Sequence, residues 1–250
     1  MLIPFGPEIW YADGPPVRWL GFPYPTRMAV VRLSGDKLWV WSPISPTESL
    51  AEHVQGLGRV THLVSPNKLH HLFLRPWHER WPEALLHASP GLPRKRPDLP
   101  FGSLLADEPH PGWAGEIDQV VFRGSLVMDE VVFFHRKSRT AIVADLVQKL
   151  DPSPYARWQR LLLRLDGVLG EKGSAPREWR ALFWNRKLAR KALHSVLGWQ
   201  PERLLLAHGT CVPSGASEAL REAFSWLGTE DARETPSVPR ENGHFEEGRL

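Results

Sequence analysis

The chain has 250 residues, of which 42% are hydrophobic and 24% charged, with a formal net charge of +3 and a single cysteine. This length suits one large domain that buries a sizeable core. The single cysteine excludes an intramolecular disulfide framework and a cysteine-rich zinc site, and the small net charge gives no reason to expect binding to nucleic acid.

No stretch near the start has the charged beginning and apolar core of a signal peptide. No apolar run approaches the roughly 20 residues that a membrane-spanning helix needs. We therefore expect a cytoplasmic protein without membrane contact. A small molecule of unknown identity is the expected substrate, and the sequence predicts no particular oligomeric state.

The first part of the chain predicts strands joined by short turns, followed by a helix. A Ser-Gly-Asp turn between two apolar runs indicates a hairpin. Thr47 or Ser45 can cap the helix, and Leu50 and Val54 share one of its faces. In chain order the expected elements are an edge strand at 8–11, a turn at 12–15, hairpin strands at 28–33 and 37–41, and a helix at 47–57.

The functional prediction depends on the stretch V-T-H-L-V-S-P-N-K-L-H-H-L-F-L-R-P-W, residues 60–77. Its first residues are β-prone, and Ser-Pro-Asn then ends the strand, because proline lacks an amide hydrogen and asparagine favours turns. His70 and His71 follow at the edge of that turn, before a predicted helix. A strand that ends and places two imidazoles on a loop is typical of a metal or catalytic site.

The rest of the chain predicts further strands, a helical insertion and a last helix. Asp145 stands at the end of an apolar strand, where a carboxylate has no structural reason to be unless it is paired, bound or solvated. We expect one domain over residues 1–228 and a disordered tail over 229–250. The expected elements are strand 84–88, a surface loop at 93–111 that could overhang the site, strands 117–122, 130–135 and 140–146, helical insertion 151–198 interrupted at 167–176, strand 203–207 and helix 217–227.

Three segments carry a resemblance to a known superfamily. S-P-N-K-L-H-H resembles a degenerate copy of the T-H-x-H-x-D-H signature of the metallo-β-lactamase superfamily, in the same strand-to-helix setting. S-R-T-A-I-V-A-D-L resembles its strand that ends in a metal-bridging aspartate, and L-L-L-A-H-G-T its last strand, which ends in a histidine ligand. Over roughly residues 1–228 the chain is similar to an uncharacterised, mainly bacterial family of that superfamily, a domain of unknown function. The resemblance implies an α/β fold, an αββα sandwich with a helical insertion before the last strand.

The resemblance also implies a set of metal ligands. The superfamily's signature aspartate matches His70, and its last signature histidine matches His71. Its bridging aspartate matches Asp145, and its final histidine matches His208. Two earlier signature histidines fall on Pro66 and Lys68, which removes one of the two metal sites. The implied cofactor is therefore one divalent metal, with zinc preferred over iron, and a metal-free protein is the alternative.

Four further residues are candidates for roles at this site. Asp145 could orient a metal-bound water as well as bind the metal. Glu130 and His135 lie in a β-run whose alternation favours apolar residues, so they are candidates to support the ligands or to act as acid or base, and a satisfied pair at a strand end is the alternative. Lys68 could replace the charge of the lost metal and hold an anionic substrate. Asn67 could donate a hydrogen bond to a substrate oxygen, although a turn role explains it as well.

These residues predict a mononuclear metal-dependent hydrolase of a small ester, thioester or phosphoester. Two alternatives stay open. The loss of one metal site motivates a catalytically inactive sandwich that binds a ligand or a partner protein. The superfamily that the chain resembles also includes iron-dependent activities, so a metal-dependent oxidoreductase is the other alternative.

Overall fold

The computed structural model describes residues 1–19, 21–170 and 173–228, so the tail predicted over 229–250 lies outside the described residues. Within the described part of the chain, none of the helices has the length and apolar character needed to cross a membrane.

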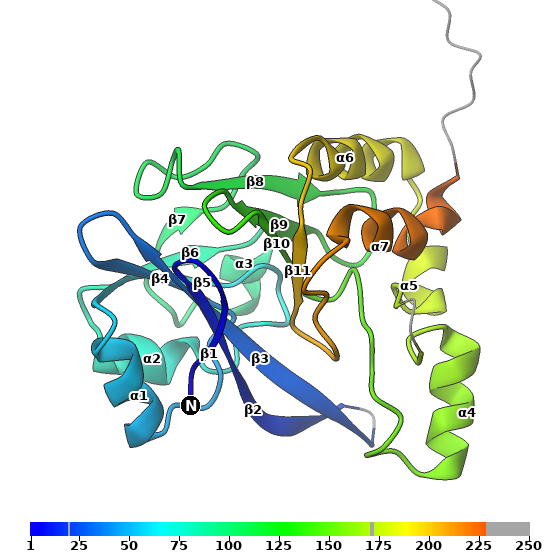
Figure 1. The fold of residues 1–250 in the computed structure, drawn as a ribbon, viewed down its shortest axis with the longest axis horizontal. Coiled ribbons are helices and arrows are strands. Elements are labelled where there is room, and N and C mark those ends of the chain that lie inside the picture. Colours follow the sequence, from blue (N-terminus) through cyan, green and yellow to red (C-terminus); the bar gives the residue numbers. More distant parts are fainter. Residues whose placement is uncertain (20, 171–172, 229–250) are drawn as a thin grey trace, which may run out of the picture.

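The described strands form two sheets (Figure 1). The first sheet has the order β1-β2-β3-β4-β5-β6-β7, antiparallel from β1 to β4 and parallel from β4 to β7. Its strands are β1 (Ile3–Gly6), β2 (Ile9–Trp19), β3 (Phe22–Leu33), β4 (Lys37–Trp41), β5 (Arg59–Val64), β6 (Leu85–Ala88) and β7 (Phe101–Leu104). The second sheet has the order β11-β10-β9-β8, with only the β10–β11 pair parallel. Its strands are β8 (Ile117–Phe122), β9 (Glu130–His135), β10 (Thr140–Val143) and β11 (Arg203–Leu206).

Helices connect the strands. They are α1 (Glu48–Gln55), α2 (Leu74–Arg80), α3 (Leu92–Lys95), α4 (Arg157–Asp166), α5 (Arg177–Ala181), α6 (Arg186–Gly198), α7 (Ala216–Ala223) and the 3-10 helix η1 (Ser225–Leu227). Of these, α1, α2, α6 and α7 contribute to the outer faces of the two sheets. As predicted, the side chain of Thr47 caps α1 by accepting a hydrogen bond from the backbone N–H of Leu50.

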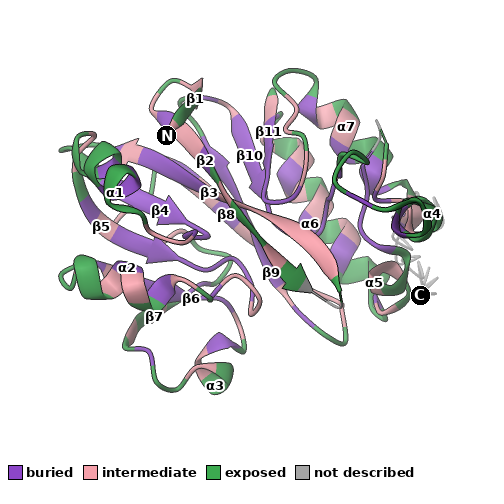
Figure 2. Ribbon diagram, turned by 90° about the horizontal axis from the view of Figure 1, so that it is seen from below, coloured by how far each residue is buried: buried purple, intermediate pink, exposed green. Residues whose placement is uncertain are grey.

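Three apolar clusters define the layers. The inner faces of the two sheets pack against each other, with Trp39 and Phe133 in edge-to-face contact. Leu50 and Trp77, from α1 and α2, belong to a second cluster on the outer face of the first sheet. The third joins α6 and α7 to the outer face of the second sheet. Figure 2 shows β4 and β10 buried along most of their length, whereas β3 is only partly buried in its first half and the helices expose one side. The layer order is that of the predicted αββα sandwich.

Several elements differ from the sequence prediction. The strand expected at the edge over 8–11 belongs to β2, which pairs with β3 on one side and with β1, the actual edge strand, on the other. The turn expected at 12–15 lies inside β2, which continues through a register shift between Gly14 and Val17 and pairs with β3 along a long hairpin. The loop expected at 93–111 contains part of α3 and all of β7, because β7 completes the parallel edge beside β6. The second helical stretch of the insertion divides into α5 and α6, where the side chain of Asn185 caps α6.

Candidate metal centre

Three strand ends meet at one edge of the sandwich. Neighbouring strands β10 and β11 are parallel, with Val143 opposite Leu206, so each delivers a polar residue just beyond its carboxyl end. These residues are Asp145 and His208. The turn after β5 brings His70 to them from the other sheet, and the backbone carbonyl of Pro66 in that turn accepts a hydrogen bond from the N–H of Val131 in β9.

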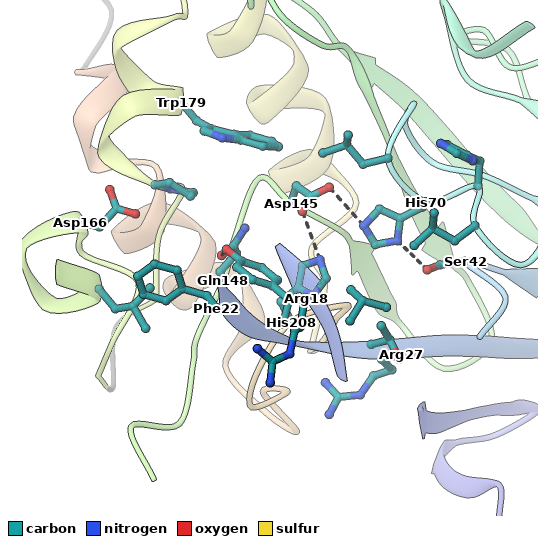
Figure 3. Close-up of a pocket in the computed structure, with 18 of the residues that line it drawn as sticks. Arg18, Phe22, Arg27, Ser42, His70, Asp145, Gln148, Asp166, Trp179 and His208 are labelled. Carbon is teal, nitrogen blue, oxygen red and sulfur yellow. Dashed lines mark hydrogen bonds and ion pairs between the residues drawn. The ribbon is translucent and has the colours of Figure 1, made fainter. Parts of the chain in front are cut away.

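His70, Asp145 and His208 form a compact cluster (Figure 3). The Nε2 atom of His70 lies 3.1 Å from Asp145 Oδ2, and the Nε2 atom of His208 lies 3.1 Å from Asp145 Oδ1. The carboxylate thus stands between the two imidazoles. One ligand-type atom of each residue lies within 4.8 Å of those of the other two.

The Nδ1 atom of each imidazole, which faces away from Asp145, also has a hydrogen-bond partner. His70 Nδ1 lies 2.6 Å from Ser42 Oγ, and His208 Nδ1 lies 2.7 Å from the carbonyl oxygen of Pro25. A carbonyl only accepts, so His208 carries its proton on Nδ1, and in the neutral ring Nε2 is a bare acceptor. That acceptor faces another acceptor, Asp145 Oδ1, and only a cation or an extra proton between them makes the contact favourable. Metal-bound histidines commonly donate their other N–H to a carbonyl in this way, so these residues fit a metal ion.

Asn67 and Glu130 support the cluster from beneath. Asn67 Nδ2 donates to Asp145 Oδ2 at 2.7 Å and to Glu130 Oε2 at 3.0 Å, while its Oδ1 accepts from the backbone N–H groups of Leu69 and His70. Glu130 accepts from the backbone N–H of Asp145 and of the residue before it, each at 2.8 Å. Both Asn67 and Glu130 are fully buried, so they position the ligands and do not face substrate.

The protonation of the two carboxyls reflects this environment. Burial disfavours the charge on Asp145, but the imidazoles of His70 and His208 outweigh it and hold the pKa of that carboxyl well below its usual range. Burial and the charge of Asp145 raise the pKa of Glu130, and its three N–H donors oppose the rise. Asp145 is therefore the ionised member of the pair.

The structure does not bring His71 into the cluster. Its Nδ1 atom accepts a hydrogen bond from Arg96 Nη1 at 2.9 Å, which directs the ring toward α3 and the segment after it. Adjacent residues of a tight turn point in different directions, so only His70 reaches Asp145. The predicted set of four ligands is therefore three in the structure, and His71 lies beside them at the wall of the cavity.

His135 lies at the opposite end of β9 from Glu130 and does not reach the site. A strand rises about 3.3 Å per residue, so the two ends of this six-residue strand are roughly 16 Å apart. His135 Nδ1 instead lies 2.7 Å from Ser138 Oγ at the β9–β10 turn. The acid/base role predicted for His135 therefore has no geometric support. The alternative, a satisfied pair of Glu130 and His135, is also wrong, because the two lie at opposite ends of β9 and bond to other partners.

The burial of His135 predicts acid-sensitive stability. Burial lowers its pKa to about 4 from 6.5. Between these values the unfolded chain binds a proton that the folded chain does not, so this contribution is complete above pH 6.5 and is lost as the pH falls to 4. At pH 5 the loss is about 2 kcal/mol. We expect the free energy of urea unfolding to fall less between pH 7 and pH 5 in His135→Asn than in the wild type; an equal fall would contradict this assignment.

A cavity of about 840 Å³ opens over the cluster. Its walls come from the β2–β3 hairpin, the loop that carries His70, and helices α4 and α5, and Figure 3 shows Phe22 and Trp179 on the side opposite the imidazoles. Lys95, and not the predicted Lys68, is in its lining. Lys95 Nζ donates to the backbone carbonyl of Lys68 at 2.9 Å.

Sequence reasoning missed several residues of this site. Ser42 holds His70 and adopts a φ of 49°, which is uncommon for a residue other than glycine. Tyr24 packs edge-on against His208 and donates to Gln148 Oε1 at 2.6 Å. Burial and the charge of Asp145 raise the pKa of Tyr24, so its hydroxyl stays protonated. The positive φ of Ser42 and the hairpin position of Tyr24 leave no recognisable sequence signal.

Comparison with known proteins identifies the fold to which this site belongs. No curated protein matches the chain. The DIM-1 metallo-β-lactamase is 15% identical with a TM-score of 0.63, over 91% of this chain and 95% of that one. A metallo-β-lactamase from Pontibacter korlensis is 13% identical with a TM-score of 0.62, over 91% and 98%. The FIM-1 enzyme from Pseudomonas aeruginosa, in its mono-zinc form, is 10% identical with a TM-score of 0.60, over 91% and 94%.

At these identities the solved structures show the fold alone, and they confirm the predicted metallo-β-lactamase-like α/β sandwich. The family model described as Domain of unknown function (DUF4336) matches residues 17–161, which is more than half of the 250 residues. The chain therefore belongs to the DUF4336 family, within the metallo-β-lactamase fold.

Proposed function

We propose that the protein is a mononuclear metal-dependent hydrolase of an ester, thioester or phosphoester. The observation that carries the proposal is the contact between His208 Nε2 and Asp145 Oδ1, which lie 3.1 Å apart while His208 Nδ1 donates to Pro25, so that both atoms are acceptors in the neutral ring. A divalent cation held by His70, Asp145 and His208 would satisfy both acceptors. Its positive charge would also offset the buried carboxylate.

Three protein ligands leave a coordination position open, as in catalytic zinc sites. An ion held there would act as a Lewis acid that polarises a carbonyl or phosphoryl oxygen and activates water. The protein's part is positioning. Ser42 and the carbonyl of Pro25 orient the two imidazoles, and Asn67 orients the carboxylate. The mono-zinc form of FIM-1 shows that a protein of this fold can hold a single zinc ion.

The cavity favours a substrate with an apolar part. Its volume of about 840 Å³ is near the upper end of the range for drug-sized ligands. Phe22, Trp179 and Leu165 supply apolar wall, while Arg18 and Lys95 add positive charge. We therefore infer a substrate that places its scissile bond at Asp145, an apolar group against α4 and α5, and an anionic group near the cations.

Trp179→Ala tests the apolar wall. We expect KM to rise about tenfold for a nitrophenyl ester with a medium-length acyl chain, because the lost indole removes buried apolar contact. The acetyl ester, which is too short to reach α5, should be unaffected. Trp184→Ala is the matched control, since Trp184 is 84% exposed and outside the cavity lining. Equal effects of the two substitutions would contradict the placement.

The activity is tested on purified protein stripped of metal and reconstituted with zinc. Nitrophenyl carboxylic esters, an acyl thioester with thiol detection, and bis(nitrophenyl) phosphate cover the three substrate classes. Turnover of one class that requires zinc and disappears with a chelator supports the proposal. Reconstituted protein that binds zinc and hydrolyses none of the three classes would overturn it, and protein that binds no metal would favour an inactive ligand-binding domain.

One observation favours a second candidate function. Two histidines and one carboxylate are also the ligand set of non-haem iron(II) oxygenases. An iron-dependent oxidoreductase is therefore the second candidate. Elemental analysis of protein purified without added metal distinguishes the two, since about one iron per chain, rather than zinc, would support oxidation chemistry.

A further inference from the structure

A second histidine cluster lies in the described structure away from the centre built on Asp145. It consists of His62 in β5, His87 in β6 and His110 in the segment after β7, and one ring nitrogen of each lies within 4.8 Å of the others. The proposed function uses none of these residues. Each comes from a different element, so the fold alone brings them together.

The pairing of β5 with β6 explains the first two positions. These parallel strands place His62 opposite Leu85 and Val64 opposite His87. His62 and His87 are therefore diagonal neighbours on one face of the sheet. That face is the inner one, because Val64 belongs to the apolar cluster between the two sheets.

The third histidine and a tryptophan close the cluster from the inter-sheet side. The His110 ring centroid lies 4.7 Å from that of His87 and 5.8 Å from that of His62. The Trp113 ring lies between 4.6 and 5.2 Å from all three imidazoles. Its indole N–H donates elsewhere, to Gln119 Oε1, so the indole offers the cluster only its apolar ring.

The hydrogen bonds within the cluster are incomplete. One bond joins His62 Nδ1 to His87 Nε2 at 3.0 Å, and the backbone N–H of Gly112 donates to His110 Nδ1. The other ring nitrogen of His87, Nδ1, is fully buried and has no partner among the described residues. Buried polar atoms are normally satisfied, so this nitrogen needs a water molecule, while the nitrogen of His87 that meets His62 is Nε2.

The absence of a side chain at Gly112 leaves room for the rings of His62 and His110 to lie close together. A Cβ atom at Gly112 would lie 2.6 Å from His62 Cε1 and 3.0 Å from His110 Nδ1. Burial lowers the pKa of all three histidines, to about 4 for His62 and about 2 for His87, so the rings are neutral at pH 7. Neutral imidazole is the form that binds a metal.

We propose that His62, His87 and His110 form a second metal site, which takes one divalent transition-metal ion of the zinc class. Three imidazoles without a carboxylate suit zinc, copper or nickel and do not suit magnesium or calcium. The ion would fasten the segment after β7, which carries His110, to β5 and β6. His110 is partly exposed, so water could complete the coordination.

The test counts zinc ions on the metal-stripped full-length chain by competition with a chromophoric chelator. His208→Ala removes a ligand of the first centre and leaves this cluster intact. We expect His208→Ala to bind one zinc, and the double variants with His110→Gln or Gly112→Ala to lose at least about 100-fold in affinity. Gly112→Ala keeps all three histidines and only separates their rings. His194→Gln, an exposed histidine on α6, is the control that should change nothing.

Cobalt gives a second readout that depends on position. Co²⁺ bound among these histidines should quench the fluorescence of Trp113, and His208→Ala/Trp113→Phe should lose that quenching while keeping the bound ion.

If His208→Ala binds no zinc while the wild type binds one, the second site is refuted and the first stands. If His208→Ala binds one zinc ion and adding His110→Gln removes that ion, the second site is supported, whether or not the first centre binds zinc. Unchanged zinc affinity in both double variants would also refute it.

Discussion

Asp145→Asn is expected to remove metal from the first centre without destabilising the metal-free fold. When His208 is neutral, its Nε2 atom and Asp145 Oδ1 are opposed acceptors, and Asn67 Nδ2 donates to the other carboxylate oxygen. An asparagine amide can donate to His208 and still accept from Asn67, so the variant satisfies this network by itself. Without the negative charge, zinc affinity at this centre should fall by more than about 100-fold, beyond the loss typical of a supporting hydrogen bond.

Two measurements check this result. Urea unfolding in the presence of a chelator should give Asp145→Asn a free energy of unfolding no lower than that of the wild type. Zinc should then stabilise the wild type more than the variant, because a ligand that binds only the folded state adds to its stability. Metal-free wild type that is more stable than Asp145→Asn by several kcal/mol would instead indicate a protonated His208 and an ion pair with no metal.

Two adjacent histidines provide the matched control for ligand identity. His70→Ala should lose the same metal as His208→Ala, whereas His71→Ala should keep it, because His71 bonds to Arg96 and stands outside the cluster. The two substitutions remove the same side chain at neighbouring positions. Loss of metal in His71→Ala would restore the set of four ligands that the superfamily resemblance implies.

The strands and their polar ends were accessible from sequence for a physical reason. Alternation and turn residues report burial locally, so the sequence alone could place Asp145 and His208 at the ends of apolar runs. The choice between His70 and His71 could not be made in that way. It depends on how Asn67 Oδ1 folds the turn back onto the N–H groups of Leu69 and His70, a set of contacts without periodicity.

Residues that meet only in three dimensions were out of reach. Glu130 and His135 stand five positions apart on one strand, and only the direction of β9 decides that Glu130 lies at the centre. The cluster of His62, His87 and His110 has no motif, because its spacing follows from the register of β5 on β6 and the path of the segment after β7. Sequence patterns report which face a residue is on, whereas the neighbours across a sheet follow from topology.

Asn67→Ala is expected to be among the most destabilising polar substitutions in the chain. Asn67 is fully buried and its side chain makes four hydrogen bonds, two to carboxyl groups and two from backbone N–H groups. Alanine leaves Asp145 and Glu130 each short of a donor and frees the turn that carries His70. The cost should be about 3–5 kcal/mol in the free energy of urea unfolding, as when a buried charged network loses one member.

Asn185→Ala is the matched control for that substitution, because the side chain of Asn185 caps α6 by accepting a hydrogen bond from the N–H of Leu188. It should cost about 1 kcal/mol. Asn67→Ala should also weaken zinc binding about 10- to 100-fold through the loss of support to Asp145, while Asn185→Ala leaves it unchanged. Equal destabilisation by the two variants would mean that Asn67 does no more than shape a turn. A larger loss of stability and of zinc affinity in Asn67→Ala than in Asn185→Ala would instead identify Asn67 as the residue that joins the β5 turn to both carboxyl groups.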